Sequence, residues 1–135
     1  MTTDDELVAA AREAFERSYA PYSKFYVGSA ILGASGKVYK GCNVENASYG
    51  GTICAERSAV STMVMDGEKR ILRVAVFTDH DHPPPPCGIC RQVMREFGTE
   101  MTVISETLAG DRKVWTLDEL LPDSFGPADL GVDED

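Results

Sequence analysis

The sequence predicts an α/β fold in three layers, α-β-α, with helices on both faces of a mixed five-stranded sheet. Helical and strand-like segments follow one another in the order α, β, β, α, β, α, β, β, α. Two capping boxes, at Thr3 with Glu6 and at Thr116 with Glu119, mark helix starts. A short, mostly apolar run at residues 71–77, between two helical segments, suits a buried strand.

The first half of the chain is typical of a helix, an antiparallel hairpin and a second helix. The first helix is expected to follow the capping box at Thr3, with apolar positions from Leu7 to Tyr19, and the other elements are expected at residues 25–32, 37–44 and 54–65. Helical spacing of apolar side chains indicates the first helix until Pro21 stops the pattern. A short Gly-Ala-Ser-Gly segment joins the two strands and favours a hairpin. Good helix formers indicate the second helix, and Gly67 supplies its C-terminal stop.

The pattern in the second half of the chain predicts a buried strand, a helix, another hairpin and a short final helix. The strands and the longer helix are expected at residues 71–77, 88–97, 101–105 and 113–116, and the short helix follows Thr116. Four consecutive prolines, at residues 83–86, exclude regular structure and lead the chain stiffly to Cys87. The last two strands are close enough in sequence to form a hairpin.

Length and charge limit the possible functions. At 135 residues the chain fits a single domain, residues 1–135, in which residues 128–135 form a flexible acidic tail. The formal net charge is −9, and no basic cluster is present, so we expect a small-molecule substrate and no nucleic-acid partner. No apolar run approaches the roughly 20 residues that cross a bilayer, and the acidic first residues are unlike a signal peptide. We therefore expect no membrane partner and a cytoplasmic location.

Three of the four cysteines form a pattern typical of catalytic zinc, which keeps three protein ligands and leaves a fourth position for water. Cys54 and the pair Cys87 and Cys90 each stand where a helix is expected to begin, so two helix dipoles face the thiolates. Glu56 follows Cys54 by two residues, and a ligand-x-Glu segment with a later Pro-Cys-x-x-Cys is the signature of zinc deaminases. The pattern predicts Cys54, Cys87 and Cys90 as metal ligands and Glu56 as the catalytic carboxylate.

Two other interpretations of the cysteines stay open. Cys42 could complete a closed zinc site in a non-enzymatic interaction module, although its place in a strand suits packing as a small apolar residue. Alternatively, Cys87 and Cys90 could form a zinc-free redox pair, but this leaves the Cys54-Ala55-Glu56 segment unexplained.

The run Asp79-His80-Asp81-His82 has the composition of a further metal cluster. It lies in a proline-flanked loop, without helical or strand geometry that would bring its side chains together. We therefore interpret it as a solvated loop.

Five blocks of the sequence together resemble the cytidine deaminase family of the short, homotetrameric kind. The blocks are residues 22–25, 43–49, 52–57, 86–92 and 119–127, and the resemblance covers nearly the whole chain. It implies a cytidine deaminase-like fold, one Zn²⁺ per subunit and a homotetramer whose active sites are shared between subunits. It also implies hydrolytic deamination of cytidine and deoxycytidine to uridine and deoxyuridine plus ammonia, in pyrimidine salvage, with a zinc-bound hydroxide and a glutamate proton shuttle. A deaminase of the nucleoside blasticidin S, which shares the three-cysteine site, is the nearest alternative.

The resemblance also implies the substrate-binding residues Phe25, Asn43, Glu45, Tyr49, Ala55 and Phe125. By this resemblance the ring of Phe25 is expected to pack against the nucleoside, and Asn43 and Glu45 are expected to hydrogen-bond the ribose 3′-hydroxyl. Backbone near Ala55 is expected to read the amide edge of the base together with Glu56. Tyr49 and Phe125 are expected to reach the pocket of a neighbouring subunit.

Arg57 has an expected electrostatic role. Three thiolates on a dication leave a net charge of −1, which weakens the metal as a Lewis acid. Two helix ends, at about +0.5 each, and the guanidinium of Arg57 together add about +2 and offset this charge. The resemblance implies that an arginine at this position hydrogen-bonds the ligand thiolates, so we expect Arg57 to support the zinc site.

Overall fold

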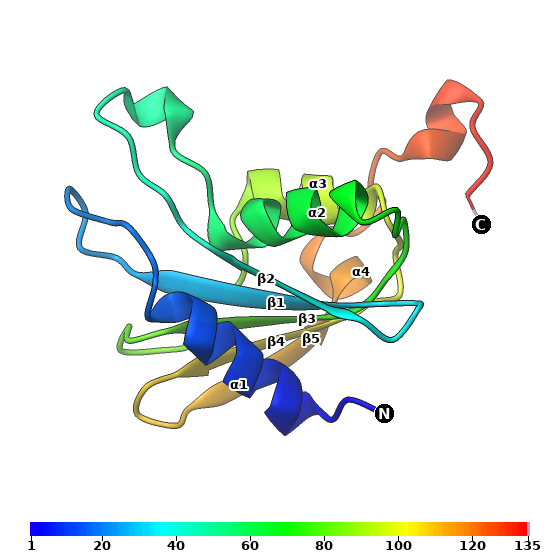
Figure 1. The fold of residues 1–135 in the computed structure, drawn as a ribbon. Coiled ribbons are helices and arrows are strands. Elements are labelled where there is room, and N and C mark those ends of the chain that lie inside the picture. Colours follow the sequence, from blue (N-terminus) through cyan, green and yellow to red (C-terminus); the bar gives the residue numbers. More distant parts are fainter. Residues whose placement is uncertain (135) are drawn as a thin grey trace.

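The computed structural model describes residues 1–134 and has the predicted arrangement of a mixed five-stranded sheet between helices (Figure 1). The helices are α1 (Asp4–Phe15), α2 (Ala55–Met65), α3 (Gly88–Arg95) and α4 (Leu117–Leu120), with 3-10 turns η1 (Tyr49–Gly51) and η2 (Pro127–Leu130). The strands are β1 (Val27–Gly33), β2 (Val38–Cys42), β3 (Ile71–Thr78), β4 (Thr102–Thr107) and β5 (Arg112–Thr116). Both predicted capping boxes are present, at the starts of α1 and α4.

The strands lie in the order β2-β1-β3-β4-β5. Both predicted hairpins are confirmed as antiparallel pairs, β1 with β2 and β4 with β5. The central pair, β3 and β4, is parallel, so the chain must cross from one end of the sheet to the other between them. This crossover contains the proline run and α3, and it carries the chain past the carboxyl end of β3.

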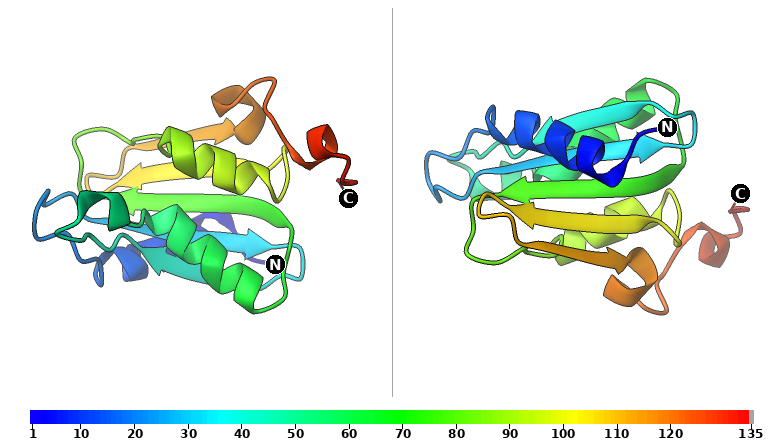
Figure 2. Two further views of the ribbon diagram at one scale, coloured as in Figure 1. Left: turned by 90° about the horizontal axis from the view of Figure 1, so that it is seen from above. Right: turned by 90° about the horizontal axis from the view of Figure 1, so that it is seen from below.

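The two faces of the sheet are covered by different helices (Figure 2). Helix α1 packs on one face, where its Leu7 joins Phe77 of β3 in the core. Helices α2 and α3 lie side by side on the other face, where Met63 and Met94 are fully buried. Among residues 1–134, no helix is both long and apolar enough to cross a bilayer.

Two glycines let the helices approach the β1–β2 hairpin closely. A Cβ atom on Gly28 would lie 2.0 Å from the carbonyl oxygen of Ala11 in α1. A Cβ atom on Gly41 would lie 2.3 Å from the backbone nitrogen of Ala59 in α2. A side chain at either position therefore forces a helix away from the sheet.

The first helix ends earlier than the sequence pattern predicts. It stops at Phe15, although apolar spacing continues to Tyr19. The N–H of Tyr19 instead donates to the carbonyl of Asn43 at 2.9 Å, and its own carbonyl accepts from the N–H of Glu45 at 2.9 Å. This bridge to a distant segment takes the backbone groups that a longer helix would have used.

The C-terminal segment folds back onto the end of α3. Arg95 is only 7% exposed; its Nε donates to the Ser124 hydroxyl at 2.6 Å, and its Nη1 donates to Glu134 at 2.5 Å. Asp135, the last residue of the predicted acidic tail, lies outside the described residues. The flexibility of that tail and the single-domain organisation stay predictions.

Candidate metal centre and active site

Three cysteine sulfurs converge where α2 and α3 begin. Cys54 is the N-cap of α2, Cys87 is the N-cap of α3, and Cys90 lies in the first turn of α3. All three sulfurs lie within 4.8 Å of one another, and those of Cys54 and Cys87 are 3.9 Å apart. Sulfurs that share a tetrahedral zinc ion at about 2.3 Å are separated by about 3.8 Å. The three side chains therefore fit one zinc ion, between two helix N-termini as the sequence predicts.

The pKa values of Cys54 and Cys90 are shifted in opposite directions. The pKa of Cys54 is lowered to about 5, chiefly because Cys90 hydrogen-bonds its thiolate and also because Arg57 and Cys87 do. The pKa of Cys90 is raised, because its proton is held in the bond to Cys54 and because the side chain is buried. Because the thiolate is the form that binds a metal ion, the lowered pKa of Cys54 favours a cation at this site.

Arg57 lies beside the sulfur group, where its positive charge offsets the net charge of −1 that three thiolates and a divalent ion would carry. Its Nη2 donates to the sulfur of Cys54 at 3.4 Å and to the carbonyl of Thr52 at 3.4 Å. Among the described residues, its Nε is one of two buried side-chain nitrogen or oxygen atoms without a hydrogen-bond partner. The guanidinium is therefore oriented by the sulfur group, and within residues 1–134 no carboxylate forms a salt bridge with it.

Glu56 is buried in the first turn of α2, with 5% of its surface exposed. Its pKa is raised to about 7, mainly by burial and also by the neighbouring thiolate of Cys54. The Glu56 charge in turn contributes to the raised pKa of Cys90, so the carboxyl group acts electrostatically on the sulfur group. A carboxyl group that titrates near neutral pH can both take up and release a proton under working conditions.

Asn43 and Glu45 both hold the loop that carries Phe25. The Asn43 amide accepts from the N–H of Val27 at 3.0 Å and donates to the carbonyl of Phe25 at 2.7 Å. One carboxylate oxygen of Glu45 accepts from two successive backbone N–H groups at 3.0 and 3.1 Å, and the Ser23 hydroxyl donates to the other. The ring of Phe25, 39% exposed, is thus presented by an organised loop.

Tyr49 and Phe125 are not brought together within one chain. Tyr49 lies in η1 and is 78% exposed, whereas Phe125 precedes η2 and is 59% exposed. These two segments lie at opposite ends of the molecule, as the views in Figures 1 and 2 agree. Ala55, by contrast, is fully buried as the first residue of α2, directly between Cys54 and Glu56.

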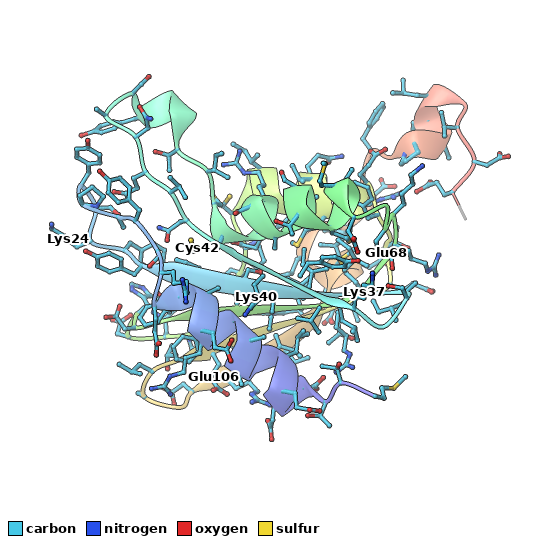
Figure 3. The ribbon with its side chains drawn as sticks, in the orientation of Figure 1. Lys24, Lys37, Lys40, Cys42, Glu68 and Glu106 are labelled. Atoms are coloured by element: carbon cyan, nitrogen blue, oxygen red, sulfur yellow. The ribbon has the colours of Figure 1, made fainter. Side chains whose placement is uncertain are left out.

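Cys42 takes no part in the sulfur group. It lies at the end of β2 (Figure 3), and its thiol donates to the carbonyl of Arg17 at 3.7 Å. In the described part of the chain, the cysteines that cluster are only Cys54, Cys87 and Cys90. The interpretation of Cys42 as a fourth ligand, which would close the site, is wrong because its sulfur is held elsewhere.

Arg91 organises the approach to Cys87 and is not predicted from the sequence. Its Nε donates to the carbonyl of Pro86 at 2.7 Å, and its Nη1 donates to the carbonyl of Leu120 at 2.8 Å. The next residue, Gln92, donates to the carbonyl of Phe125 at 2.9 Å. Their position directly after Cys90, within the block 86–92, is the one available signal.

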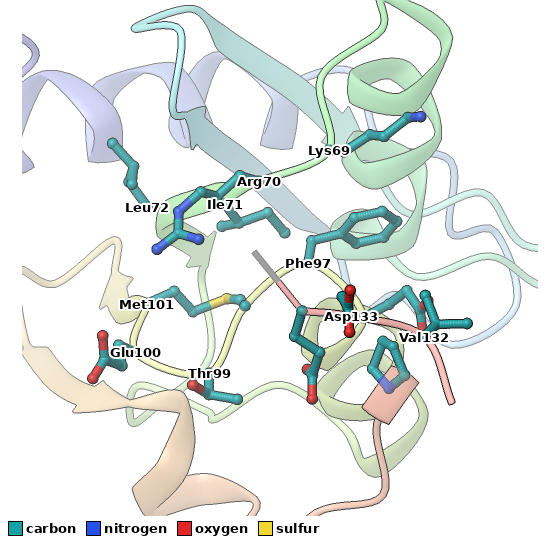
Figure 4. A pocket seen from close by; sticks show the side chains of 14 residues that line it. Lys69, Arg70, Ile71, Leu72, Phe97, Thr99, Glu100, Met101, Val132 and Asp133 are labelled. Atoms are coloured by element: carbon teal, nitrogen blue, oxygen red, sulfur yellow. The ribbon is translucent and has the colours of Figure 1, made fainter. Parts of the chain in front are cut away.

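A hollow of about 760 Å³ lies away from the sulfur group (Figure 4). It is lined by residues 69–72 and 96–101 together with Pro127 and residues 132–134. None of the three clustered cysteines lines it, so its size alone does not make it the active site.

The interpretation of residues 79–82 as a solvated loop without converging side chains is wrong in one respect. The loop is exposed, but donor atoms of His80, Asp81 and His82 lie within 4.8 Å of one another. The positions of exposed side chains in an irregular loop are not encoded in any periodic pattern, so the sequence could not predict this contact.

Comparison with known proteins identifies the family. The profile of the "Cytidine and deoxycytidylate deaminase zinc-binding region" matches residues 1–106. A cytidine deaminase of Sporosarcina psychrophila is 44% identical, covering 93% of each chain. The crystal structure of a cytidine deaminase from Burkholderia pseudomallei matches with a TM-score of 0.87 and 44% identity, over 91% of this chain and 99% of that one. A crystal structure from Mycobacterium tuberculosis, also of a cytidine deaminase, matches with a TM-score of 0.80 and 40% identity, over 92% and 98% of the two chains.

The names of these proteins give no support to a blasticidin S deaminase or to a non-enzymatic module. The match extends over the helix starts that bear Cys54, Cys87 and Cys90, so the zinc-binding region of the profile includes the site described above. The chain belongs to the cytidine and deoxycytidylate deaminase family.

Proposed function

We propose that the protein catalyses the hydrolytic deamination of cytidine and deoxycytidine to uridine and deoxyuridine, with release of ammonia, in pyrimidine salvage. The observation that carries this proposal is the convergence of three sulfurs beside a buried carboxyl group whose pKa is raised to about 7. A site with three protein ligands leaves one position for water, as catalytic zinc requires. The names of the similar proteins described above support the nucleoside as substrate.

Glu56 moves the protons in this proposal. Zinc, held by Cys54, Cys87 and Cys90, would supply an electrophilic centre that acidifies water. The Glu56 carboxylate accepts a proton from the attacking water and delivers it to N3 of cytosine, which makes C4 more electrophilic. As the water oxygen bonds to C4, Glu56 carries the second proton to the exocyclic nitrogen, the C4–N bond breaks and ammonia leaves. Burial keeps the pKa of Glu56 near 7, which suits both transfers.

The nucleoside is positioned by the loop around Phe25 and by the start of α2. We assign base stacking to Phe25, contacts with the ribose 3′-hydroxyl to Asn43 and Glu45, and recognition of the base to backbone at Ala55. The hydrogen bonds of Asn43 and Glu45 to the Phe25 loop support a shared task, because a change at either polar residue also displaces the ring.

The active form in this proposal is a homotetramer in which Tyr49 and Phe125 complete the pocket of a neighbouring subunit. Both aromatic rings are largely exposed, and the segments that carry them, η1 and the residues just before η2, lie at opposite ends of one chain, which supports a role across a subunit boundary. Sedimentation of active enzyme at assay concentration tests this assignment: a fully active monomer contradicts it. The cytoplasmic location stays a prediction.

Deamination is tested by loading the chain with zinc and following the ultraviolet absorbance change from cytidine to uridine. We expect one zinc ion per chain and turnover of both cytidine and deoxycytidine. Blasticidin S, offered in competition at the same concentration, is expected to be consumed far more slowly. A zinc-loaded chain that leaves both nucleosides unchanged overturns the proposal, and faster turnover of blasticidin S overturns the substrate assignment.

A further inference from the structure

All histidine in this chain is concentrated in one exposed tripeptide. The sequence contains two histidines, His80 and His82, and both flank Asp81. The tripeptide follows the end of β3 and precedes the four prolines that lead to Cys87. The deamination mechanism uses none of its three side chains.

The three side chains are already close to the spacing of metal ligands. His80 Nε2 lies 3.2 Å from Asp81 Oδ1, and His82 Nδ1 lies 2.7 Å from the same oxygen. The centroids of the two imidazole rings are 4.5 Å apart. Nitrogen and oxygen ligands of a tetrahedral ion at about 2.1 Å are separated by about 3.4 Å. Small side-chain rotations therefore suffice to place one ion between the three donor atoms.

The donor chemistry selects a class of ion. Two imidazoles and one carboxylate suit borderline divalent metals such as Zn²⁺, Ni²⁺ and Cu²⁺, whereas Mg²⁺ and Ca²⁺ prefer oxygen ligands alone. All three side chains are exposed, so water can fill the remaining coordination positions. The formal net charge of −9 also draws cations to the surface.

The ends of this loop are held firmly. At its start, the buried hydroxyl of Thr78 donates to the carbonyl of Tyr26 at 2.6 Å. At its end, the proline run restricts the backbone, and Pro86 is fully buried. The ring of His80 also packs edge-on against Phe25, with centroids 5.5 Å apart. Fixed loop ends reduce the conformational entropy that ligand binding must overcome.

We propose that His80, Asp81 and His82 bind one divalent transition-metal ion beside Phe25, in addition to the ion in the three-cysteine centre. This second site differs from the first in ligand chemistry, because it offers nitrogen and oxygen donors and no sulfur. Its contact with Phe25 places it at the edge of the loop to which nucleoside binding is assigned.

The test uses zinc-loaded enzyme titrated with Ni²⁺, and the two histidines make the readout unambiguous. We expect one Ni²⁺ per chain in equilibrium dialysis, with the resident zinc retained in the same sample. Paramagnetic Ni²⁺ should broaden the imidazole proton resonances of both histidines together. His82→Asn and, separately, His80→Gln should each weaken Ni²⁺ binding at least about tenfold, since each removes one of three ligands.

Glu100→Gln is the matched control. Glu100 is an exposed carboxylate just before β4, and because β3 and β4 are parallel it lies at the sheet end opposite to His80. This variant should bind Ni²⁺ like the parent. Equal Ni²⁺ affinity in the parent and both histidine variants, or Ni²⁺ uptake that leaves both imidazole resonances sharp, overturns the second site. Cytidine turnover before nickel is added is a separate reading, so failure of the second site and failure of deamination are distinguishable.

Discussion

Arg57 Nη2 donates to the sulfur of Cys54 across 3.4 Å, from the same helix turn that Cys54 caps. The bond raises the pKa of the guanidinium and lowers that of the thiol, so each group favours the charged form of the other. The arginine therefore contributes directly to the charge of the metal centre.

We expect Arg57→Ala to retain zinc and to lower kcat about 10- to 100-fold, the usual effect of losing a partner that hydrogen-bonds a metal ligand. Without the guanidinium, the three thiolates leave the centre more negative, so a zinc ion held there would acidify water less. Zinc analysis and steady-state kinetics on the same preparation measure both effects. Arg17→Ala, which changes an exposed arginine, is the control. Parent-like turnover in the metal-loaded Arg57→Ala enzyme contradicts the role assigned to Arg57.

Glu56→Gln should keep one zinc ion per chain and lower kcat by about 10²- to 10⁴-fold, the usual contribution of a general acid–base group. Glutamine has nearly the same shape but cannot accept or deliver the protons. Glu16→Gln, at an exposed carboxylate just after α1, should be unchanged. If zinc-loaded Glu56→Gln deaminated cytidine at the parent rate, Glu56 would not be the proton shuttle.

The buried Glu56 carboxyl group should also make the stability of the metal-free protein depend on pH. Its folded-state pKa is raised from 4.5 to about 7, so its contribution is fully present below pH 4.5 and is lost as pH rises through 7. The whole effect is of the order of 3 kcal/mol.

The pH effect is measured by comparing metal-free parent with metal-free Glu56→Gln in urea unfolding between pH 4.5 and 8. The free energy of unfolding of the variant, relative to that of the parent, should increase with pH, because only the parent buries a charge at pH 8. A difference that stays constant across this range means that burial does not raise the pKa of Glu56.

Gly41→Ala should lower the free energy of unfolding by at least about 2 kcal/mol, because the new methyl group meets the backbone of α2. Gly50→Ala is the matched control, since nothing lies within 4 Å of a Cβ atom there, and it should change stability by less than about 0.5 kcal/mol. Urea unfolding of both variants in parallel measures the difference. Equal stabilities would show that α2 can move away from the sheet at little cost.

The element order could be predicted from the sequence because each signal is local. Capping boxes, the proline run and alternating or helical spacing all act within a few residues, and they predict the four α-helices and five strands in their observed order. The end of α1 could not be placed in this way. It depends on the pairing of Tyr19 with Asn43 and Glu45, and a contact between distant segments leaves no local pattern at Phe15.

For the side chains of the site and its surroundings, too, contacts within one helix turn could be predicted and contacts between distant segments could not. Cys54, Glu56 and Arg57 share one helix turn, so their spacing predicts their proximity. Long-range support is not visible in that spacing. Arg95 looks like an ordinary surface residue of an amphipathic helix, yet its partners Ser124 and Glu134 follow it by 29 and 39 residues. The convergence of His80 with His82 depends on side-chain rotations in an irregular loop, which composition does not specify.

Cys54 and Cys87 are 33 residues apart, and the whole of β3 lies between them in the chain. In the native structure their sulfurs meet because α2 and α3 dock side by side on one face of the sheet that has β3 at its centre. If the complete set of ligands forms only once both helices are docked, zinc should slow unfolding and leave the refolding rate unchanged. We therefore expect a bound metal ion to lengthen the lifetime of the folded chain.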